Sequence, residues 1–283
     1  MKIVFPTDFS ESANKAFAYA LKIADNLGAE IITVHAYELP RVSPRHMPNT
    51  LADIYDSIQL EKFEDYRDEV PALRKIADDL NLSRVRVSNV MQEGSPISTI
   101  VRVAKNEKAD LIIMGTKGAT GLREIFLGSV TGEVMEKATC PVLGVPEKAV
   151  IENGSKIIAV TTDFKEEDAL ALQQVMNLAS KLDAEVHCIH FDILGSETIL
   201  HRLNSWKDTM DFDVGNIHFE VISTANLEQG MIKYIEDKKV SITAMLTHKR
   251  GFFEELFNYS LAKKMSYHLK TPVLAIPAGI FKK

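Results

Sequence analysis

The sequence repeats itself, and the repeat decides most of what the chain can form. Thr7-Asp8-Phe9 returns as Thr162-Asp163-Phe164, and Pro141-Val142-Leu143 returns as Pro272-Val273-Leu274. Three further matches lie between these in the same order: Leu27–Glu30 with Leu182–Glu185, His35 with His190, and Met114–Thr116 with Met245–Thr247. Ordered correspondence of this length predicts two copies of one domain. Because the chain has 283 residues, each copy would have the usual size of a domain.

A linker separates the two copies. We expect domains at residues 1–147 and 155–283, joined by a linker from Glu147 to Ser155 that contains Asn153-Gly154. Inside the first copy, Ile31–Val34 is apolar on both faces, which predicts a buried strand. Apolar strands of this kind alternate with amphipathic helical patterns. The alternation predicts an α/β fold with a parallel sheet covered by helices on both faces.

Caps and breakers place the individual elements. Ser10 can cap a helix that Gly28 ends, and three prolines between Tyr37 and Thr50 predict a loop before a long helical pattern from Leu51 to Leu80. For that loop, a plain surface connection is favoured over a flexible lid. The remaining expected features are a strand around Val85–Val90, a helix capped by Ser95 with Pro96 in its first turn, a strand at Val142–Val145 whose flanking prolines are typical of a sheet edge, and, in the second copy, a helix cap at Asn226 with Gln229.

Composition excludes several classes of function. The net charge of -6 at pH 7 argues against a general surface for nucleic acid or anionic membrane, because both need an excess of basic residues. No run approaches the roughly 20 apolar residues of a membrane-spanning helix, and Met1–Pro6 leads into a strand rather than a signal peptide. Cys140 and Cys188 lack a nearby second cysteine, and His187 and His190 point to opposite faces of one strand. We therefore expect a reduced, cytoplasmic protein without a zinc site.

One stretch of the first copy is suited to a ligand. The apolar run Leu111–Met114 ends in Gly115, Gly118 follows, and Gly128-Ser129 opens the amphipathic segment Val130–Lys137. Glycines at a strand exit and at a helix start let the backbone approach a ligand closely. The free N–H groups of a helix start favour an anion, typically a phosphate. These residues predict a phosphate-bearing small molecule that is held mainly by backbone.

The spacing of these glycines matches a known pattern. Gly115-x2-Gly118-x9-Gly128-Ser129, together with the opening Pro6–Ser10 and the strand that ends at His35, resembles the signature of the universal stress protein family. The resemblance covers the whole chain as a tandem of two such domains, closely in the first copy and only in layout in the second. It implies that each domain is a five-stranded parallel α/β sheet of the adenine nucleotide alpha hydrolase-like, Rossmann-like type.

The resemblance also implies a ligand and the residues around it. In nucleotide-binding members, ATP, with or without Mg²⁺, lies at the carboxyl ends of the strands, where open α/β sheets generally bind ligands. The matching positions are Pro6, Thr7, Asp8 and the backbone of Ala36 near the adenosine, Met114 and Gly115 at the ribose, and Gly118, Gly128, Ser129 and Val130 around the phosphates, with Thr116 in the same loop. No catalytic residue and no metal ligand is among them.

Each of these assignments has a simpler alternative that the residues alone leave open. Gly115 and Gly118 could serve a turn only, and Asp8 could simply stabilise one. Ser129 would cap its helix whether or not a phosphate is bound.

Signatures of catalysis are missing from the chain. The phosphate-binding loop with lysine and the dinucleotide-type glycine triplet are absent, and Gly128–Gly132 places its serine one residue too early for a nucleophile elbow. Pro6–Ser10 stands where related ATP pyrophosphatases carry a serine-glycine-glycine loop. Lys117 and Arg123 could meet phosphates, although lone basic residues in a polar loop are usually solvated. We expect binding without efficient chemistry, with slow ATP hydrolysis at most.

The second copy departs from the ligand-binding pattern. The changes are Leu246 for Gly115, Lys249 for Gly118, Tyr259 for Gly128 and Phe191 for Ala36, whereas Ser260 keeps its place. Bulky side chains would fill a site in which backbone must touch the ligand. Thr162 and Asp163 survive, but a retained turn explains them equally well. We predict that only the N-terminal domain binds ATP in the manner of the family.

Two functions of different classes follow. The leading prediction is a stress-response protein that senses or stores nucleotide in its first domain. The alternative is a nucleotide-independent scaffold, for which Trp206 and Gly251–Phe253 are candidate contact surfaces, although aromatics more often pack in a core. Family members commonly pair through their last strands, so we expect Val142–Val145 and Val273–Ile276 to pair within the chain as a built-in dimer. A homodimer of tandems is a further option.

Overall fold

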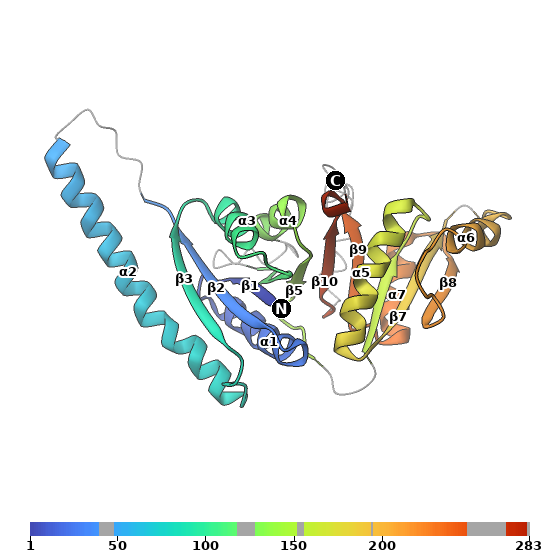
Figure 1. Ribbon diagram of the computed structural model, residues 1–283, viewed down its shortest axis with the longest axis horizontal. Coiled ribbons are helices and arrows are strands. Elements are labelled where there is room, and N and C mark those ends of the chain that lie inside the picture. The colour runs from blue at the N-terminus through green and yellow to red at the C-terminus, as the bar shows by residue number, and fades with distance from the viewer. Residues whose placement is uncertain (40–47, 118–127, 152–155, 194, 248–269, 282–283) are drawn as a thin grey trace.

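The computed structural model describes residues 1–39, 48–117, 128–151, 156–193, 195–247 and 270–281. In the first half, strands and helices alternate along the chain (Figure 1). Its elements are β1 (Lys2–Pro6), α1 (Glu11–Leu27), β2 (Glu30–Tyr37), α2 (Pro48–Asp79), β3 (Val87–Glu93), α3 (Pro96–Asn106), β4 (Leu111–Gly115), α4 (Ser129–Lys137) and β5 (Val142–Val145).

The second half repeats this alternation beside the first (Figure 1). Its elements are β6 (Lys156–Thr161), α5 (Glu166–Leu182), β7 (Ala184–Asp192), α6 (Ile199–Lys207), β8 (Ile217–Ser223), α7 (Leu227–Lys238), β9 (Ile242–Thr247), β10 (Val273–Pro277) and the 3-10 turn η1 (Ala278–Phe281). Strands β6 to β10 correspond in order to β1 to β5.

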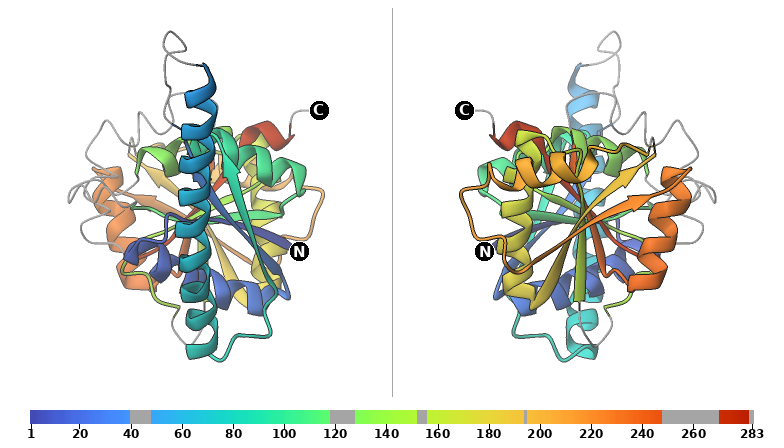
Figure 2. Two further views of the ribbon diagram at one scale, coloured as in Figure 1. Left: turned by 90° about the vertical axis from the view of Figure 1, so that its left-hand side faces the viewer. Right: turned by 90° about the vertical axis from the view of Figure 1, so that its right-hand side faces the viewer.

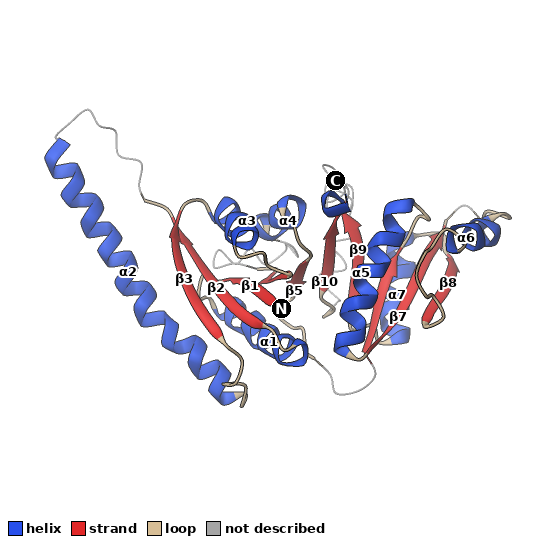
Figure 3. Ribbon diagram, in the orientation of Figure 1, coloured by secondary structure: helices blue, strands red, loops and turns tan. Residues whose placement is uncertain are grey.

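The strands form a single sheet in the order β3-β2-β1-β4-β5-β10-β9-β6-β7-β8 (Figure 3). Within each half neighbouring strands are parallel, and corresponding strands hold the same places. The register supports the correspondence: Ile3 pairs with Leu111 in the first half, and their counterparts Ile158 and Ile242 pair in the second. The prediction of two repeated five-stranded parallel α/β units is confirmed.

The halves meet through β5 and β10, which pair antiparallel. Leu143 lies opposite Leu274, its own counterpart in the repeat, and Val142 and Ala275 are paired on one side of it. Such a self-matching register is that of a two-fold axis, here between two halves of one chain. The flanking prolines predict a sheet edge for β5. It does end the parallel set of its own half, but β10 covers its outer side and hides an otherwise unpaired backbone.

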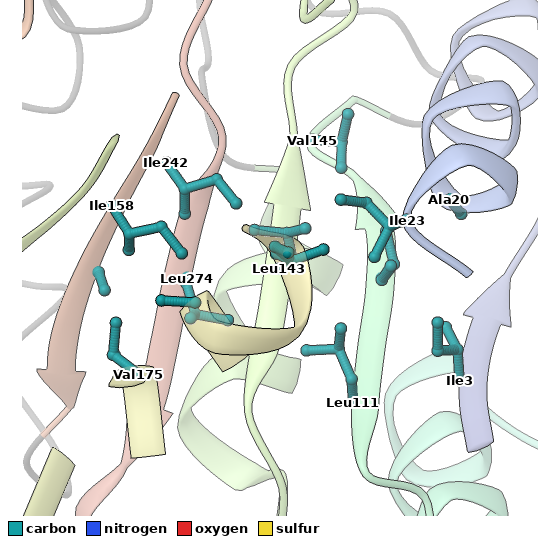
Figure 4. Close-up of a cluster of buried hydrophobic side chains, with 14 of the residues drawn as sticks. Ile3, Ala20, Ile23, Leu111, Leu143, Val145, Ile158, Val175, Ile242 and Leu274 are labelled. Carbon is teal, nitrogen blue, oxygen red and sulfur yellow. The ribbon is translucent and has the colours of Figure 1, made fainter. Parts of the chain in front are cut away.

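Helices cover both faces of the sheet, and each face has its own core (Figure 2). Helices α1, α2, α5 and α6 cover one face, and α3, α4 and α7 cover the other. Figure 4 shows the core under α1 and α5 crossing the junction, from Ile3 through Leu143 and Leu274 to Ile158. The two halves therefore share this core instead of only touching at a strand edge.

The ends of α1 and α7 follow the caps that the sequence predicts, whereas the start of α3 does so only in part. Ser10 is the N-cap of α1 and accepts a hydrogen bond from its first turn, and Gly28 ends the helix in the left-handed conformation with φ 59°. Asn226 accepts a hydrogen bond from the backbone N of Gln229 at 3.0 Å. Ser95 is the N-cap residue of α3, but its side chain makes no capping hydrogen bond.

The halves differ most in the segment that follows their second strand. Helix α2 has 32 residues and extends beyond the rest of the first half, whereas α6 has 9 (Figure 1). The long helical pattern predicted from Leu51 to Leu80 is thus confirmed. None of the helices in the described part of the chain, α2 included, is long and apolar enough to cross a membrane.

Candidate functional site

The strand order brings the predicted ligand residues to one edge of the sheet. Strands β2, β1 and β4 are adjacent and parallel, so their carboxyl ends lie side by side. These ends carry Ala36, Pro6–Asp8 and Met114–Thr116. The chain builds outward from β1 to β3 and then crosses back to β4, so its connections diverge between β1 and β4. In open α/β sheets such a switch point is where ligands bind.

The turn after β1 is held by its own polar groups. Thr7 is buried, its backbone N donates to Val34 O at 2.9 Å, and its Oγ1 accepts from Phe9 N at 3.0 Å. This turn forces Phe9 into the left-handed region, with φ 56°. Asp8 is exposed, and its Oδ1 accepts from Ser10 N at 3.1 Å and from Ser10 Oγ at 2.6 Å. Asp8 therefore stabilises the turn and presents its carboxylate at the surface of the strand edge.

The exit of β4 is tied directly to the start of α4. Thr116 is buried, and its N donates to Val145 O at 3.1 Å. Its O accepts from Gly128 N at 2.7 Å, and Thr131 Oγ1 donates to Gly115 O at 2.9 Å. The strand end and the first turn of α4 thus form one rigid piece. Gly118 lies between them, outside the described residues.

The N-cap of α4 is Gly128, with Ser129 as the first helical residue. The expectation that Ser129 caps this helix is therefore wrong, because no side chain makes a capping hydrogen bond there. Ser129 is exposed, and Val130 is half-buried against the core under α3 and α4. An N-terminus without a side-chain cap keeps its first N–H groups available to an anion.

The two described glycines of the motif differ in what surrounds them. A Cβ on Gly128 would lie 3.2 Å from Thr116 O, which is a tight contact with backbone. A Cβ on Gly115 would meet Ala16 Cβ at 3.5 Å, which is ordinary van der Waals contact. Packing of the protein therefore explains the glycine at 128 in part, but it does not explain the one at 115. A ligand that approaches the backbone there would explain both.

The predicted contacts of Met114 and Ala36 depend on how these residues lie in their strands. The side chain of Met114 is 5% exposed and belongs to the core under α3 and α4, so it is turned away from solvent. Only the main chain of Met114 can face a ligand at the strand edge. Ala36 lies on β2 opposite Gln92 of β3, and it is half-buried.

The cations near this edge are already paired. Glu147 accepts from Lys117 Nζ at 3.3 Å and from Lys15 Nζ at 3.0 Å, and Lys15 also contacts Glu11 at 2.8 Å. Hydrogen bonds from Lys15 and Lys117 lower the pKa of the Glu147 carboxyl. Lys117 would have to leave Glu147 to meet a phosphate. The other predicted cation, Arg123, lies outside the described residues.

The second half holds its corresponding turn with a different carboxylate. Oδ2 of Asp168 accepts hydrogen bonds from Thr162 Oγ1 at 3.1 Å and from the backbone N of Asp163 and Lys165 at 2.9 and 3.1 Å. Asp168 is buried, whereas the side chain of Asp163 is 70% exposed. The Thr-Asp-Phe turn is thus built twice. In the first half Asp8 accepts the hydrogen bonds from Ser10, whereas in the second half Asp168 holds the turn and Asp163 contacts Lys165 at 3.6 Å and His190 at 4.0 Å.

Sequence reasoning did not find Asp168. Its counterpart in the first half is Ala13, so the repeat itself gives no hint of the change. The available signal was its position three residues after Lys165, the N-cap of α5, where an acidic side chain reaches back to the cap backbone.

The other predicted replacements in the second half are buried or undescribed. Leu246, at the position of Gly115, and Phe191, at the position of Ala36, are both buried, 5% and 8% exposed. They belong to cores on opposite faces of the sheet. Lys249, Tyr259 and Ser260 lie outside the described residues.

Histidines at the strand ends have structural roles. His35 Nδ1 lies 2.9 Å from Thr7 O, and His190 Nδ1 lies 2.7 Å from Thr162 O, so each ring donates to the carbonyl of the neighbouring strand end. His35 is also packed at its strand end, since its ring lies against Phe9 with centroids 5.1 Å apart.

His187 faces the other side of β7 from His190, as predicted. Its Nδ1 lies 2.8 Å from Tyr234 Oη, and its ring centroid is 4.8 Å from that of His218. Burial, and secondarily His218, lowers the pKa of His187. Across the residues that the structure describes, no group of three or more His, Cys, Asp or Glu side chains could hold a metal ion.

Trp206 does not offer a contact surface. It is 5% exposed, its Nε1 donates to Lys165 O at 2.8 Å, and its ring centroid is 5.5 Å from that of Phe164. It therefore packs in the core, which was the favoured use of this aromatic. The other candidate surface, Gly251–Phe253, lies outside the described residues.

Comparison with known proteins agrees with this geometry. The model of the universal stress protein family matches residues 1–146. A universal stress protein of Methanocaldococcus jannaschii is 36% identical over 142 residues, which cover 50% of this chain and 79% of that protein. One from Thermus aquaticus is 34% identical over 141 residues, covering 50% of this chain and 95% of its own length.

A solved structure extends the likeness to both halves. The crystal structure of a universal stress protein from Archaeoglobus fulgidus covers 98% of this chain and 96% of its own, with a TM-score of 0.69 and 20% sequence identity. At that identity the match shows the fold alone. The family match over the first half, set beside a fold repeated in both, leads to one conclusion: the chain belongs to the universal stress protein family.

Proposed function

We propose that the N-terminal half binds ATP at the carboxyl ends of β2, β1 and β4, and that the protein acts as a nucleotide-dependent sensor or regulator in the stress response. The observation that carries the proposal is the arrangement at β4 and α4. Gly115 O and Thr116 O fix the first turn of α4 beside the switch point, and Gly128 leaves that turn without a side-chain cap. This geometry presents backbone N–H groups to an anion and excludes bulky side chains.

The residues of the first half fit such a ligand in a defined way. Asp8 presents an exposed carboxylate that can accept hydrogen bonds from hydroxyl or amino groups of the adenosine. The backbone of Ala36 faces the adenine, and the backbone of Met114 and Gly115 faces the ribose. The phosphate chain is held by backbone around Gly128, with the remaining contacts from Thr116, Gly118, Ser129 and Val130. ATP supplies the negative charge that these N–H groups stabilise.

Among the described residues at this edge, no side chain is arranged for phosphate chemistry. Lys15 and Lys117 are both paired with Glu147, and the imidazole of His35 is occupied by Thr7 O. Binding and release of nucleotide, with slow hydrolysis at most, is therefore the activity that we assign.

The second half has a supporting role in this proposal. Asp168 already satisfies the backbone of its turn, and Leu246 and Phe191 stand where the first half has a glycine and an alanine. The second half thus keeps its fold without a ligand of this type. Pairing of β5 with β10 lets it serve as the permanent partner of the first half, so that one chain forms the equivalent of a dimer.

The cysteines fit a cytoplasmic location. Cys140 and Cys188 are free and buried, and they lie in the cores on opposite faces of the sheet. Burial raises the pKa of the Cys140 thiol to about 12, which keeps it protonated and unreactive. Two unpaired thiols are typical of a reducing compartment.

Bound nucleotide can be tested directly. Purified protein is denatured, and the supernatant is analysed for ATP and ADP by mass spectrometry. A separate, nucleotide-free sample of folded protein is titrated with ATP by calorimetry. Gly128→Tyr, which introduces the residue of the second half, should abolish retention because the ring would fill the backbone cradle. Asp8→Ala should weaken ATP binding by roughly tenfold, the loss of a charge-assisted hydrogen bond.

The matched control is the corresponding substitution in the second half. Asp163→Ala changes the counterpart of Asp8 and should leave ATP affinity unchanged. If Asp163→Ala weakens binding as much as Asp8→Ala does, or if Gly128→Tyr retains nucleotide, the assignment of the site to the first half is wrong. A protein that neither carries nor binds ATP or ADP would favour the nucleotide-independent scaffold.

A further inference from the structure

A pocket of about 420 Å³ lies at the junction of the two halves, away from the proposed nucleotide site. One wall is the C-terminal part of α1, with Tyr19, Ile23 and Asn26. The opposite wall is formed by the amino ends of β6, β9 and β10 and by the end of α7. A volume of this size is in the range of sites for small organic molecules, which often lie between domains. We call it the junction pocket.

The two-fold relation of the halves provides an internal comparison. A second pocket of about 190 Å³ is lined in part by counterparts of these residues. The matched pairs are Tyr19 with Gln174, Ile23 with Leu178, Asn26 with Lys181, Ser241 with Asp110, Ile242 with Leu111, and Pro272 with Pro141. A gap that was imposed by packing two similar halves would have the same size on both sides. The larger junction pocket also has lining residues without a match in the smaller one, among them Val150 and Ile151 of the linker, Lys239 and Lys270.

The lining of the junction pocket combines an apolar wall with basic residues. Ile23, Ile158 and Ile242 contribute apolar surface. Three lysines also line it, Lys156, Lys239 and Lys270, against Glu236 as the one acidic residue among the described lining residues. In the smaller pocket, by contrast, one lysine is balanced by one aspartate, Lys181 and Asp110.

The lysines of the junction pocket differ in how they are held. Lys156 is half-buried and its Nζ donates to Leu182 O at 2.9 Å, so its ammonium group is fixed in the wall. Lys239 and Lys270 are exposed at the rim, and neither forms an ion pair within the part of the chain that the structure describes. Each can therefore turn its ammonium group to an anion without giving up an existing partner.

We propose that the junction pocket binds a small amphipathic anion, with its apolar body against Ile23, Ile158 and Ile242 and its acid group between Lys239 and Lys270. An aliphatic or aromatic carboxylate or sulfonate has this chemistry. Such a ligand would contact α1 and the second half at once, so its binding would stabilise the junction. The proposal does not depend on nucleotide binding in the first half.

The test uses the full chain and two probes, anilinonaphthalene sulfonate followed by fluorescence and decanoate as its competitor. We expect saturable binding of one sulfonate per chain, displaced by decanoate. Ile23→Trp, which fills the pocket, should weaken binding by at least about tenfold. Its matched control, Leu178→Trp in the smaller pocket, should change affinity by less than about twofold.

Surface variants test the charges without touching the core. Lys239→Asn keeps a residue that tolerates the left-handed backbone at this position, φ 53°, and Lys270→Gln removes the second rim charge. The double variant should weaken binding several-fold and flatten its salt dependence, whereas Lys181→Gln should do neither. Circular dichroism checks the fold of each variant. Absence of saturable binding by both probes, or equal effects of Ile23→Trp and Leu178→Trp, would overturn the proposal.

Discussion

The two halves of the molecule have one fold but stabilise it differently at the carboxyl ends of their strands. In the first half, the turn after β1 is held by Asp8, which stays exposed, and the exit of β4 leads to the uncapped start of α4. In the second, the buried carboxylate of Asp168 satisfies the turn, and Leu246 is packed at the exit of β9. Among the described residues, the first half thus has an exposed carboxylate and a helix start without a side-chain cap at this edge, whereas the second half has a buried carboxylate and a buried leucine.

The difference between the halves bears on the role of Gly115. The second half shows that the fold forms with a leucine at the position of Gly115, so folding alone does not require that glycine. The space around Gly115 leads to the same conclusion, since an added Cβ would meet only ordinary contacts. The glycine is therefore not explained by packing, which is consistent with the ligand contact that we propose.

The largest expected effect is on the stability of the junction between β5 and β10, which the two halves share. Leu143 and Leu274 face each other across the two-fold axis and are 2% and 1% exposed. Each substitution by alanine should reduce the free energy of unfolding by about 3 kcal/mol through lost burial and a cavity. Urea denaturation of the two variants should give matching losses. A loss in only one of them would show that the junction is not symmetric in energy.

Placing a residue of the second half into the first should have an effect of similar size, in this case on the affinity for ATP. Gly115→Leu introduces the residue found in the second half and should weaken ATP binding by at least about 100-fold, close to 3 kcal/mol, because the side chain blocks the backbone approach. Calorimetry measures the affinity, and circular dichroism should show an intact fold. Unchanged affinity would mean that the ligand does not approach Gly115.

The carboxylate of the second half should matter for stability. Asp168→Ala leaves the N–H groups of Asp163 and Lys165 and the hydroxyl of Thr162 without their acceptor. We expect a loss of about 2 kcal/mol in the free energy of unfolding. Asp8→Ala, at an exposed carboxylate, should cost about 1 kcal/mol or less. Equal losses would show that the two turns are held in the same way.

The smallest effect is a dependence on pH that belongs to the second half. Burial lowers the pKa of His187 in the folded state, so the unfolded chain binds the proton more readily. Stability from this group is therefore present above the unfolded pKa near 6.5 and falls as the pH drops below it. His187→Gln should flatten this fall by less than about 1 kcal/mol in denaturation at pH 7 and pH 5, whereas the exposed His201→Gln should not.

Much of the fold could be predicted from the sequence because its signals are local. Apolar runs such as Ile31–Val34 and caps such as Ser10 and Gly28 act within a few residues. The repeat then shows the same order of elements a second time. The pairing of the last strands depended on the family resemblance and on the need to cover an edge. The length of α2 was predicted from one continuous helical pattern.

The site was harder to predict, because its details depend on contacts between distant segments. The N-cap of α4 falls at Gly128, not Ser129, since Gly128 N is bound by Thr116 O at the end of β4. The role of Asp168 depends on a turn that precedes it, and the repeat has an alanine at its counterpart. The junction pocket depends on α1 packing against strands of the other half, which no local pattern encodes.

The stoichiometry of ATP binding tests the central claim most directly. Nucleotide-free full-length protein is titrated with ATP by calorimetry, alongside Gly128→Tyr. We predict one ATP per chain for the natural sequence and no binding for the variant, because only the first half keeps its backbone cradle open. Two ATP per chain, or one that survives Gly128→Tyr, would contradict the account.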